Sequence, residues 1–279
     1  MNIIDGKAIA AEIRESLKTR IAALKQKGVT PGLSVVLVGD DPASATYVRS
    51  KERACEELGI FSIVHRLSAD TTQEQLTQLV HELNADKRLH GILIQSPLPS
   101  PLDELALLRE VDPDKDVDGL HVVTAGRLMV GEPGFKPCTP KGVIHLIKTT
   151  GTAISGKHAV VVGRSNMVGK PVAMMLLEEN ATVTMCHSRT QNLAAVCAGA
   201  DILVAAVGRP GLITGDFVKP GAVVIDVGTT KVDGKLAGDV VFDEAAKKAS
   251  FITPVPGGVG PMTIAMLMEN TVEAAEIHG

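Results

Sequence analysis

Short apolar runs alternate with amphipathic stretches along most of the chain. The runs at residues 33–38 and 159–162 are apolar and β-branched at nearly every position, which is typical of strands buried on both faces of a parallel sheet. At residues 7–27 and 71–84, apolar residues recur at three- and four-residue steps, and this spacing predicts helices that bury one face. The pattern therefore predicts an α/β fold in which strands and helices alternate.

Each half of the chain contains its own βαβ series, which predicts two domains. Further strands are expected at residues 60–65, 91–95, 181–185, 202–206, 222–226 and 251–252. We expect a first domain at residues 1–140 and a Rossmann-type domain at 141–261, joined by a stiff linker around 136–140. The final helix, 262–279, is expected to return to the first domain, because a Pro/Gly-rich crossover precedes it.

A glycine loop follows the strand at 159–162 and leads into a helix. Gly163 and Gly169 enclose Arg164 and Ser165, so the loop has fewer glycines than the dinucleotide fingerprint G-x-G-x-x-G, and glycine count alone is a weak signal. The N-terminus of the helix is nevertheless a ready site for a phosphate.

The next strand carries the more informative signal at its end. A site for NAD would place an acid there to bond the ribose 2′-hydroxyl. Here the strand ends in His187, Ser188, Arg189 and Thr190, with no acid. Cations and hydroxyls at this position favour a 2′-phosphate and hence NADP. The alternative is an ordinary βα turn with solvated basic residues.

Composition excludes several classes of function. The net charge of −4 and the 2% aromatic content argue against nucleic-acid binding. The four cysteines are widely spaced without a C-x-x-C pair, so neither a metal site nor a disulfide framework is expected. The chain contains neither a signal-peptide pattern nor an apolar run long enough for a membrane span, so we expect a cytoplasmic protein.

Polar residues gather where the strands of the first domain end. Asp41 and Pro42 suit the start of a helix, on which Tyr47 and Lys51 lie four residues apart and share one face. Gln95 ends the strand at 91–95. The Asp- and Gly-rich segment 111–128 predicts turns. Asp116 and Asp118 have a spacing that metal ligands use, but the segment lacks the glycine and glutamate of a calcium loop, which favours a turn with one functional carboxylate.

Six motifs in this order resemble the bifunctional methylenetetrahydrofolate dehydrogenase/methenyltetrahydrofolate cyclohydrolase family, and together they cover nearly the full length. They are Asp41-Pro42 with Tyr47-Val48-x-x-Lys51, Ile94-Gln95-x-Pro97-Leu98-Pro99, Lys115-Asp116-Val117-Asp118-Gly119, Pro137-Cys138-Thr139-Pro140, Gly163-Arg164-Ser165-x-x-Val168-Gly169-x-Pro171 and Thr253-Pro254-Val255-Pro256-Gly257-Gly258-Val259-Gly260-Pro261-Met262-Thr263.

The resemblance implies a homodimeric enzyme of one-carbon folate metabolism and purine biosynthesis. It implies a three-layer folate-binding catalytic domain, a Rossmann-type NADP domain and a cleft between them. The implied reactions are NADP-dependent oxidation of 5,10-methylenetetrahydrofolate to the methenyl cation and hydrolysis of that cation to 10-formyltetrahydrofolate.

The resemblance also implies a role for each matching residue. The implied catalytic residues are Lys51, Tyr47, Gln95 and Asp118. Folate would be bound by Tyr47 and Asp118, with Pro256, Gly257 and Gly258 as a wall of its site. NADP would be held by Gly163, Arg164, Ser165, Ser188 and Thr229. A lysine transfers protons near neutral pH when its pKa is lowered, and Gln95 can fix it without neutralising it. The alternative for Lys51 alone is a solvated helix lysine.

The chain departs from the family pattern at four places. Ser96 replaces a leucine, Val122 and Thr124 replace Pro and Asn, and Thr229-Thr230 replaces Ile-Asn. We expect the Ser96 hydroxyl to bond Lys51 or the folate and so to change the balance of the two activities. Two alternatives stay open: a dehydrogenase without cyclohydrolase activity, and a non-catalytic NADP-binding sensor.

Overall fold

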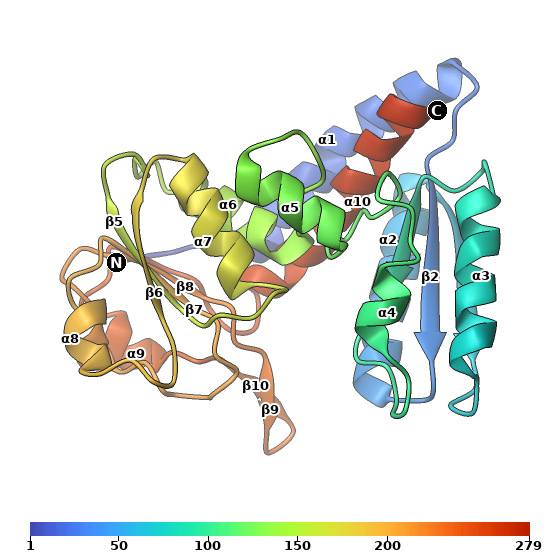
Figure 1. Ribbon diagram of the computed structural model, residues 1–279. Helices are drawn as coiled ribbons and strands as arrows, with labels where there is room; N and C mark the ends of the chain where they lie inside the picture. Colours follow the sequence, from blue (N-terminus) through green and yellow to red (C-terminus); the bar gives the residue numbers. More distant parts are fainter. The chain divides into compact units, whose positions relative to one another are not determined.

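The computed structural model describes all 279 residues, which divide into two compact units (Figure 1). Unit 1 comprises Met1–Ala11 and Thr139–Thr263, and unit 2 comprises Glu12–Cys138 and Ile264–Gly279. The predicted α/β class is confirmed. Residues 1–11 were expected in the first domain, but they belong to unit 1 because β1 pairs with β11 of its sheet.

Unit 1 is built on a six-stranded sheet in which every pairing is parallel. Its strands are, in spatial order, β1 (Asn2–Ile3), β11 (Phe251–Ile252), β8 (Val223–Asp226), β7 (Ile202–Ala205), β5 (His158–Val162) and β6 (Thr182–Cys186). From β6 to β11 this is the doubly wound order 2-1-3-4-5. The strands therefore present their carboxyl ends at one edge, where ligands bind in such sheets.

Helices cover both faces of this sheet (Figure 1). They are α6 (Cys138–Thr149), α7 (Gly169–Glu178), α8 (Leu193–Cys197), the 3₁₀ turn η1 (Gly215–Phe217) and α9 (Phe242–Ala245). Alternate residues of the strands point to opposite faces, and one set, including Val160, Leu203 and Val224, packs into a core with α8, η1 and α9. On α7, Val172 and Leu176 are fully buried.

Three features of unit 1 differ from the predictions. A hairpin of β9 (Thr230–Val232) and β10 (Lys235–Ala237) and the short α9 were not predicted. The hairpin turns at Asp233-Gly234, both with positive φ, which is the conformation an Asp-Gly turn favours. The segment 136–140 is only partly a linker, because α6 already begins at Cys138.

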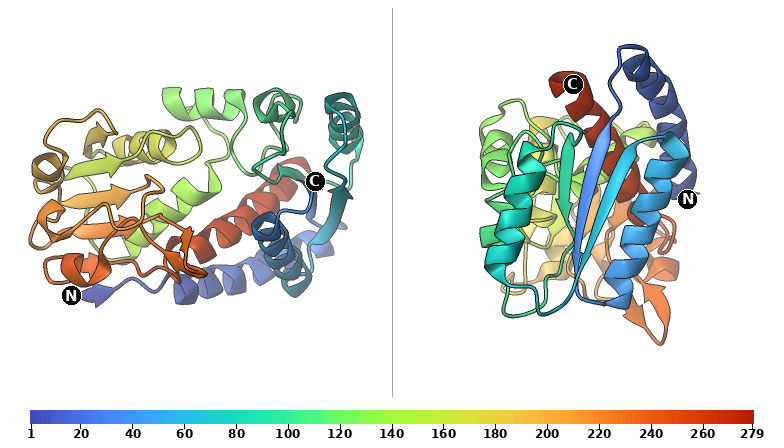
Figure 2. Two further views of the ribbon diagram at one scale, coloured as in Figure 1. Left: turned by 90° about the horizontal axis from the view of Figure 1, so that it is seen from below. Right: turned by 90° about the vertical axis from the view of Figure 1, so that its right-hand side faces the viewer.

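Unit 2 contains a three-stranded parallel sheet with helices on both sides, as predicted. Its strands are, in spatial order, β3 (Phe61–Leu67), β2 (Gly32–Val38) and β4 (Gly91–Ile94). Its crossover helices, α2 (Pro42–Leu58) and α3 (Gln73–Ala85), lie on opposite faces of the sheet (Figures 1 and 2). The core under α3 joins Leu76 and Val80 to Val36 and Ile92 of the strands.

Four further helices belong wholly or partly to unit 2: α1 (Gly6–Gln26), α4 (Glu104–Leu108), α5 (Val122–Val130) and α10 (Val259–His278). The prediction of turns throughout 111–128 is wrong for α5. His121 caps that helix, with its Nδ1 accepting from the Val123 N–H at 3.0 Å. No helix is both long and apolar enough to cross a bilayer.

Candidate functional site

Helix α2 places Tyr47 and Lys51 at the carboxyl edge of the unit 2 sheet. Asp41 caps the helix, since its Oδ2 accepts from the Ser44 N–H at 2.7 Å, and Pro42 occupies the first turn. The predicted start of this helix is therefore confirmed. Four residues apart, the two side chains have opposite exposures: Tyr47 is 41% exposed and Lys51 is 8% exposed.

Lys51 is bonded to Gln95, as predicted. Its Nζ donates to Gln95 Oε1 at 2.9 Å, and Gln95 Nε2 donates to the Ser96 carbonyl at 2.7 Å. The second bond fixes the orientation of the amide, so its oxygen faces the ammonium group. A neutral acceptor holds the lysine in place without the charge pairing that would stabilise its protonated form.

Burial lowers the pKa of Lys51 from its ordinary value. Desolvation is the largest cause, and the nearby Asp118 and Cys138 oppose it in part. A lysine with a lowered pKa exchanges a proton closer to neutral pH, which is the property a proton-transfer residue requires. A solvated helix lysine, the alternative reading of this residue, is excluded.

The two carboxylates of the segment 115–119 have different environments. Asp116 is buried and accepts from the Leu120 N–H, the His121 N–H and the Thr124 hydroxyl at 3.1, 2.9 and 2.6 Å. Burial is the main cause that raises the pKa of Asp116 to about 6. Asp118 is half-buried, and its carboxylate makes no hydrogen bond within the protein. Asp116 therefore shapes the turn, and Asp118 is free to accept from a ligand.

Asn270 on α10 holds the backbone on both sides of this turn, and its role was not predicted. The side chain is fully buried, and its Nδ2 donates to the carbonyls of Val117 and Lys136 at 2.8 and 3.0 Å. The first carbonyl immediately precedes Asp118. The available signal was the single amide side chain of a predominantly apolar helix, because a buried amide is expected to bond buried carbonyls.

The bond from Ser96 to Lys51, one of the two expected alternatives, is not formed. Its hydroxyl donates to Glu104 Oε1 at 2.6 Å, and the Leu98 N–H donates to Glu104 Oε2 at 3.1 Å. The Glu104 carboxylate thus ties down the loop after β4. The hydroxyl has no bond to Lys51, so this departure from the family pattern supports a loop and leaves the lysine's partner unchanged.

In unit 1, the loop after β5 has the geometry of a phosphate cradle. Gly163 adopts φ of +129°, and a Cβ there would collide with the Ala206 carbonyl. A Cβ at Gly169 would collide with the Gly163 carbonyl. The Ser165 hydroxyl accepts from the N–H of Gly169 at 3.3 Å, which fixes the loop against the start of α7. Both positions therefore require glycine.

The polar side chains predicted around this loop are open to ligands. Arg164, Ser188 and Thr229 are exposed and make no side-chain hydrogen bond or ion pair within the protein. They follow β5, β6 and β8, so they lie along the same edge of the sheet. No acidic residue lies in the turn at 187–190 after β6. This edge suits a nucleotide that carries an additional phosphate.

The loop after β11 lies at this edge as well. Gly257 has φ of +105°, and its carbonyl accepts from the Lys7 N–H at 3.0 Å. A Cβ at Gly6 would collide with the Gly258 carbonyl, so the start of α1 packs directly on this loop. Pro256 is exposed. No group of three or more His, Cys, Asp or Glu side chains is arranged to hold a metal ion.

Comparison with known proteins matches a family domain to each half of the chain. Residues 4–118 match "Tetrahydrofolate dehydrogenase/cyclohydrolase, catalytic domain", and residues 137–279 match the NAD(P)-binding domain of the same family. The bifunctional protein FolD of Moorella thermoacetica is 60% identical over 98% of both chains.

Two solved structures are similar over almost the whole chain. The bifunctional FolD of Campylobacter jejuni is 49% identical with a TM-score of 0.98, and covers 99% of both chains. The Trypanosoma brucei dehydrogenase-cyclohydrolase, complexed with NADP cofactor and inhibitor, is 43% identical with a TM-score of 0.94, over 99% of this chain and 97% of that one. With both halves matched in order and at this identity, the chain belongs to the tetrahydrofolate dehydrogenase/cyclohydrolase family.

Proposed function

We propose that this protein is a bifunctional enzyme of one-carbon folate metabolism. It oxidises 5,10-methylenetetrahydrofolate to the 5,10-methenyl cation with NADP, and it hydrolyses that cation to 10-formyltetrahydrofolate. The observation that carries the proposal is the buried ammonium of Lys51, 2.9 Å from the Gln95 amide oxygen. An amine with a lowered pKa beside a neutral acceptor is suited to proton transfer on a cationic substrate.

Lys51 is the catalytic residue of the hydrolysis. Water adds to the cationic carbon and loses one proton to the Lys51 amine. The proton of the resulting hydroxyl then passes to N5, the carbon–N5 bond breaks, and the formyl group stays on N10. Gln95 holds the amine in line for both transfers.

Tyr47 and Asp118 are the folate contacts of unit 2. The exposed ring of Tyr47 packs on the flat pterin, one helical turn from Lys51. The free carboxylate of Asp118 accepts from the amino edge of the pterin. For the loop after β11, the family resemblance implies that Pro256, Gly257 and Gly258 contact folate, and the two glycines allow the backbone to approach a ligand.

The carboxyl edge of the unit 1 sheet fits NADP. Gly163, with its required positive φ, and the N-terminus of α7 receive the pyrophosphate, with Ser165 beside them. Arg164 and Ser188 hold the 2′-phosphate, and Thr229 contacts the nicotinamide side. When bound, NADP supplies the acceptor for the substrate hydride.

The two alternatives are less favoured. A dehydrogenase without cyclohydrolase activity was suggested by Ser96, whose hydroxyl is instead engaged by Glu104. A non-catalytic NADP sensor would not require a buried lysine with a lowered pKa, such as Lys51 beside Gln95. We further propose that the enzyme is a homodimer, as the family resemblance implies, and that it is cytoplasmic.

The experiment is a two-stage assay of the purified protein. With methylenetetrahydrofolate and NADP we expect the absorbance of NADPH to rise, and with methenyltetrahydrofolate alone we expect the methenyl absorbance to decay faster than in buffer. Loss of the second signal alone would establish the monofunctional dehydrogenase. Loss of both signals, with NADP still bound, would establish the sensor.

A further inference from the structure

Unit 2 contains a cavity of about 540 Å³ that the proposed reaction does not use. It is lined by residues 28–30 before β2, by Phe61 at the start of β3, by residues 87, 88 and 90 before β4, and by 278–279 at the end of α10. All three strand segments approach from the amino end of the sheet. Cavities of this volume are typical of sites for small organic ligands.

The cavity is separate from the folate site. Gln95 and Lys51 lie at the carboxyl edge of the same sheet, whereas the cavity lies at its amino edge, beyond the roughly 20 Å length of β2. A ligand bound here therefore has no direct access to Lys51.

The ionisable side chains that line the cavity are all basic. They are Lys87, Arg88, His90 and His278, and no Asp or Glu side chain is among them. The Lys87 ammonium has no hydrogen-bond or ion-pair partner within the protein. Val29 and Phe61 contribute an apolar wall. The cavity therefore presents cations next to an apolar surface.

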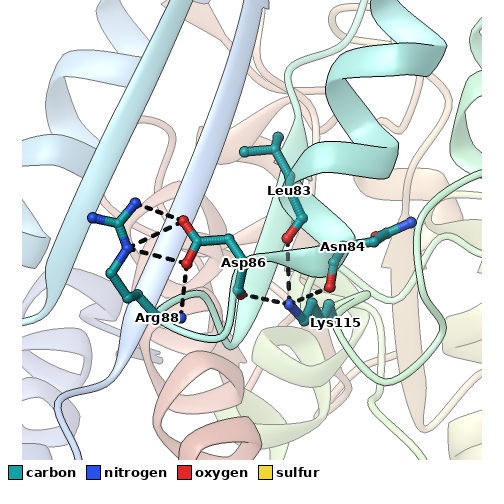
Figure 3. Close-up of polar contacts among 5 residues, drawn as sticks. All are labelled: Leu83, Asn84, Asp86, Arg88 and Lys115. Carbon is teal, nitrogen blue, oxygen red and sulfur yellow. Dashed lines mark hydrogen bonds and ion pairs between the residues drawn. The ribbon is translucent and has the colours of Figure 1, made fainter.

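Arg88 is held in place before any ligand binds. Its guanidinium pairs with the Asp86 carboxylate through Nε and Nη2, the latter at 2.7 Å, which leaves Nη1 unbonded (Figure 3). It also lies 5.4 Å from the centre of the Phe61 ring. Lys115 anchors the segment, because its Nζ donates to the carbonyls of Leu83, Asn84 and Asp86 (Figure 3).

His90 adds a donor without a partner. Its side chain is 8% exposed, and its Nδ1 accepts from the Gly32 N–H at 3.1 Å, which assigns the ring proton to Nε2. The Nε2–H has no partner in the protein, and this nitrogen is not among the polar atoms sealed from solvent. Burial is the main cause that lowers the pKa of His90, so the ring stays neutral and this tautomer persists at neutral pH.

We propose that this cavity binds a nucleoside monophosphate. Lys87 and the free edge of Arg88 receive the phosphate, His90 Nε2–H donates to an acceptor of the ligand, and the base packs on the wall of Val29 and Phe61. The volume is far larger than a phosphate ion, so it leaves room for an organic group beside the phosphate.

The test is calorimetric titration of the untagged full chain, because Gly279 itself lines the cavity. NADP is kept saturating so that the nucleotide site of unit 1 is occupied. The probes are AMP, GMP, CMP and UMP, with adenosine and inorganic phosphate as separate arms. We expect at least one monophosphate to bind with a sub-millimolar Kd, and adenosine and phosphate to bind at least tenfold more weakly. Absence of binding by all four monophosphates would overturn the proposal.

Variants locate the binding. Lys87→Glu is expected to weaken the monophosphate at least tenfold, whereas Lys87→Arg keeps the affinity within about twofold. Lys18→Glu, the same change on exposed α1, is the matched control. His90→Asn keeps an acceptor for the Gly32 N–H and removes the Nε2 donor, so it should weaken binding about tenfold. If Lys87→Glu and His90→Asn both bind like the unmodified chain, the ligand is bound elsewhere and the proposal fails.

Discussion

The two units share a strand order but differ in the state of the polar residues at their carboxyl edges. Unit 2 has the order β3-β2-β4 and unit 1 contains β6-β5-β7, so in each the first strand lies between the second and the third. In unit 2 the key amine, on Lys51, is buried and already bonded to Gln95. In unit 1 the predicted ligand contacts Arg164, Ser188 and Thr229 are exposed and unbonded.

The difference separates two requirements of one enzyme. A proton-transfer group needs its pKa set and its position fixed before the substrate arrives, which requires burial and a partner. A phosphate site needs unengaged donors and a backbone without side chains, which Gly163 and the start of α7 provide. Substitutions at the carboxyl edge of the unit 2 sheet should therefore change the rate of hydrolysis, and substitutions at the carboxyl edge of the unit 1 sheet should change the affinity for NADP.

The largest effect is expected for Lys51→Ala. Removing the amine should slow methenyl hydrolysis by about 10²–10⁴-fold, the usual contribution of a positioned proton-transfer group. The Kd for NADP should change less than about twofold. Stopped-flow decay of the methenyl absorbance and fluorescence titration with NADPH measure the two quantities. Arg53→Ala, two residues further along α2 with an 80% exposed side chain, is the control. Full hydrolysis by the lysine variant would contradict the mechanism.

Gly163→Ala should show the opposite behaviour. The new Cβ collides with the Ala206 carbonyl, and φ of +129° is unfavourable for alanine, so the loop must shift. We expect the Kd for NADP to rise about 100-fold, which corresponds to about 3 kcal/mol, with methenyl hydrolysis nearly unchanged. Gly156→Ala, also at positive φ but with open space around it, isolates the backbone cost. Equal losses in the two variants would show that the close approach is unimportant.

The third effect is the dependence of folding stability on pH that Asp116 produces. Its pKa is raised to about 6 from 3.8, so the folded state favours the protonated carboxyl. The stability from this preference is full below about pH 4 and is lost as the pH rises through 6. The shift corresponds to about 3 kcal/mol.

Asp116→Asn removes this dependence. We take the free energy of unfolding of the variant minus that of the unmodified chain. This difference should be larger at pH 7 than at pH 4 by up to about 3 kcal/mol. Urea unfolding at the two pH values measures it. Asp114→Asn, on an exposed carboxylate, should change stability by less than about 0.5 kcal/mol at either pH. A difference of the opposite sign for Asp116→Asn would show that its three hydrogen-bond donors outweigh burial.

The smallest effect is expected for Ser96→Ala. The lost hydrogen bond to Glu104 should cost about 1–2 kcal/mol of stability, because the acceptor is charged. Hydrolysis should change less than about threefold, since the hydroxyl does not touch Lys51. Thermal unfolding and the methenyl assay report the two values. A large change in the pH profile of hydrolysis would instead connect this hydroxyl to the amine.

Local signals in the sequence were sufficient for the strands, whereas the Lys51–Gln95 pair was implied by the family resemblance. Buried strands are short apolar runs, and the bond follows once the family motif places Gln95 after β4. Two elements that were not predicted, the β9–β10 hairpin and α5, do carry local signals. Asp233-Gly234 is a hairpin signal, and α5 was hidden because the Asp-rich residues before it suggested turns throughout.

Other features depend on distant parts of the chain and are not visible locally. Ser96 bonds Glu104 eight residues away, and Asn270 bonds Val117 at a separation of 153 residues. Sequence spacing gives no information about which buried carbonyl an amide will reach. The pairing of β1 with β11 is a similar case, because two residues carry too little pattern to select a partner strand.

Neither unit is a continuous stretch of chain, and all three crossings lie inside helices. Helix α1 passes from unit 1 to unit 2 between Ala11 and Glu12, α6 passes from unit 2 to unit 1 between Cys138 and Thr139, and α10 passes from unit 1 to unit 2 between Thr263 and Ile264. During synthesis, the core of unit 2 therefore stays incomplete until residues 264–279 have been added. We expect fragments cut at any single crossing to fold poorly when expressed alone, because each fragment lacks part of at least one unit.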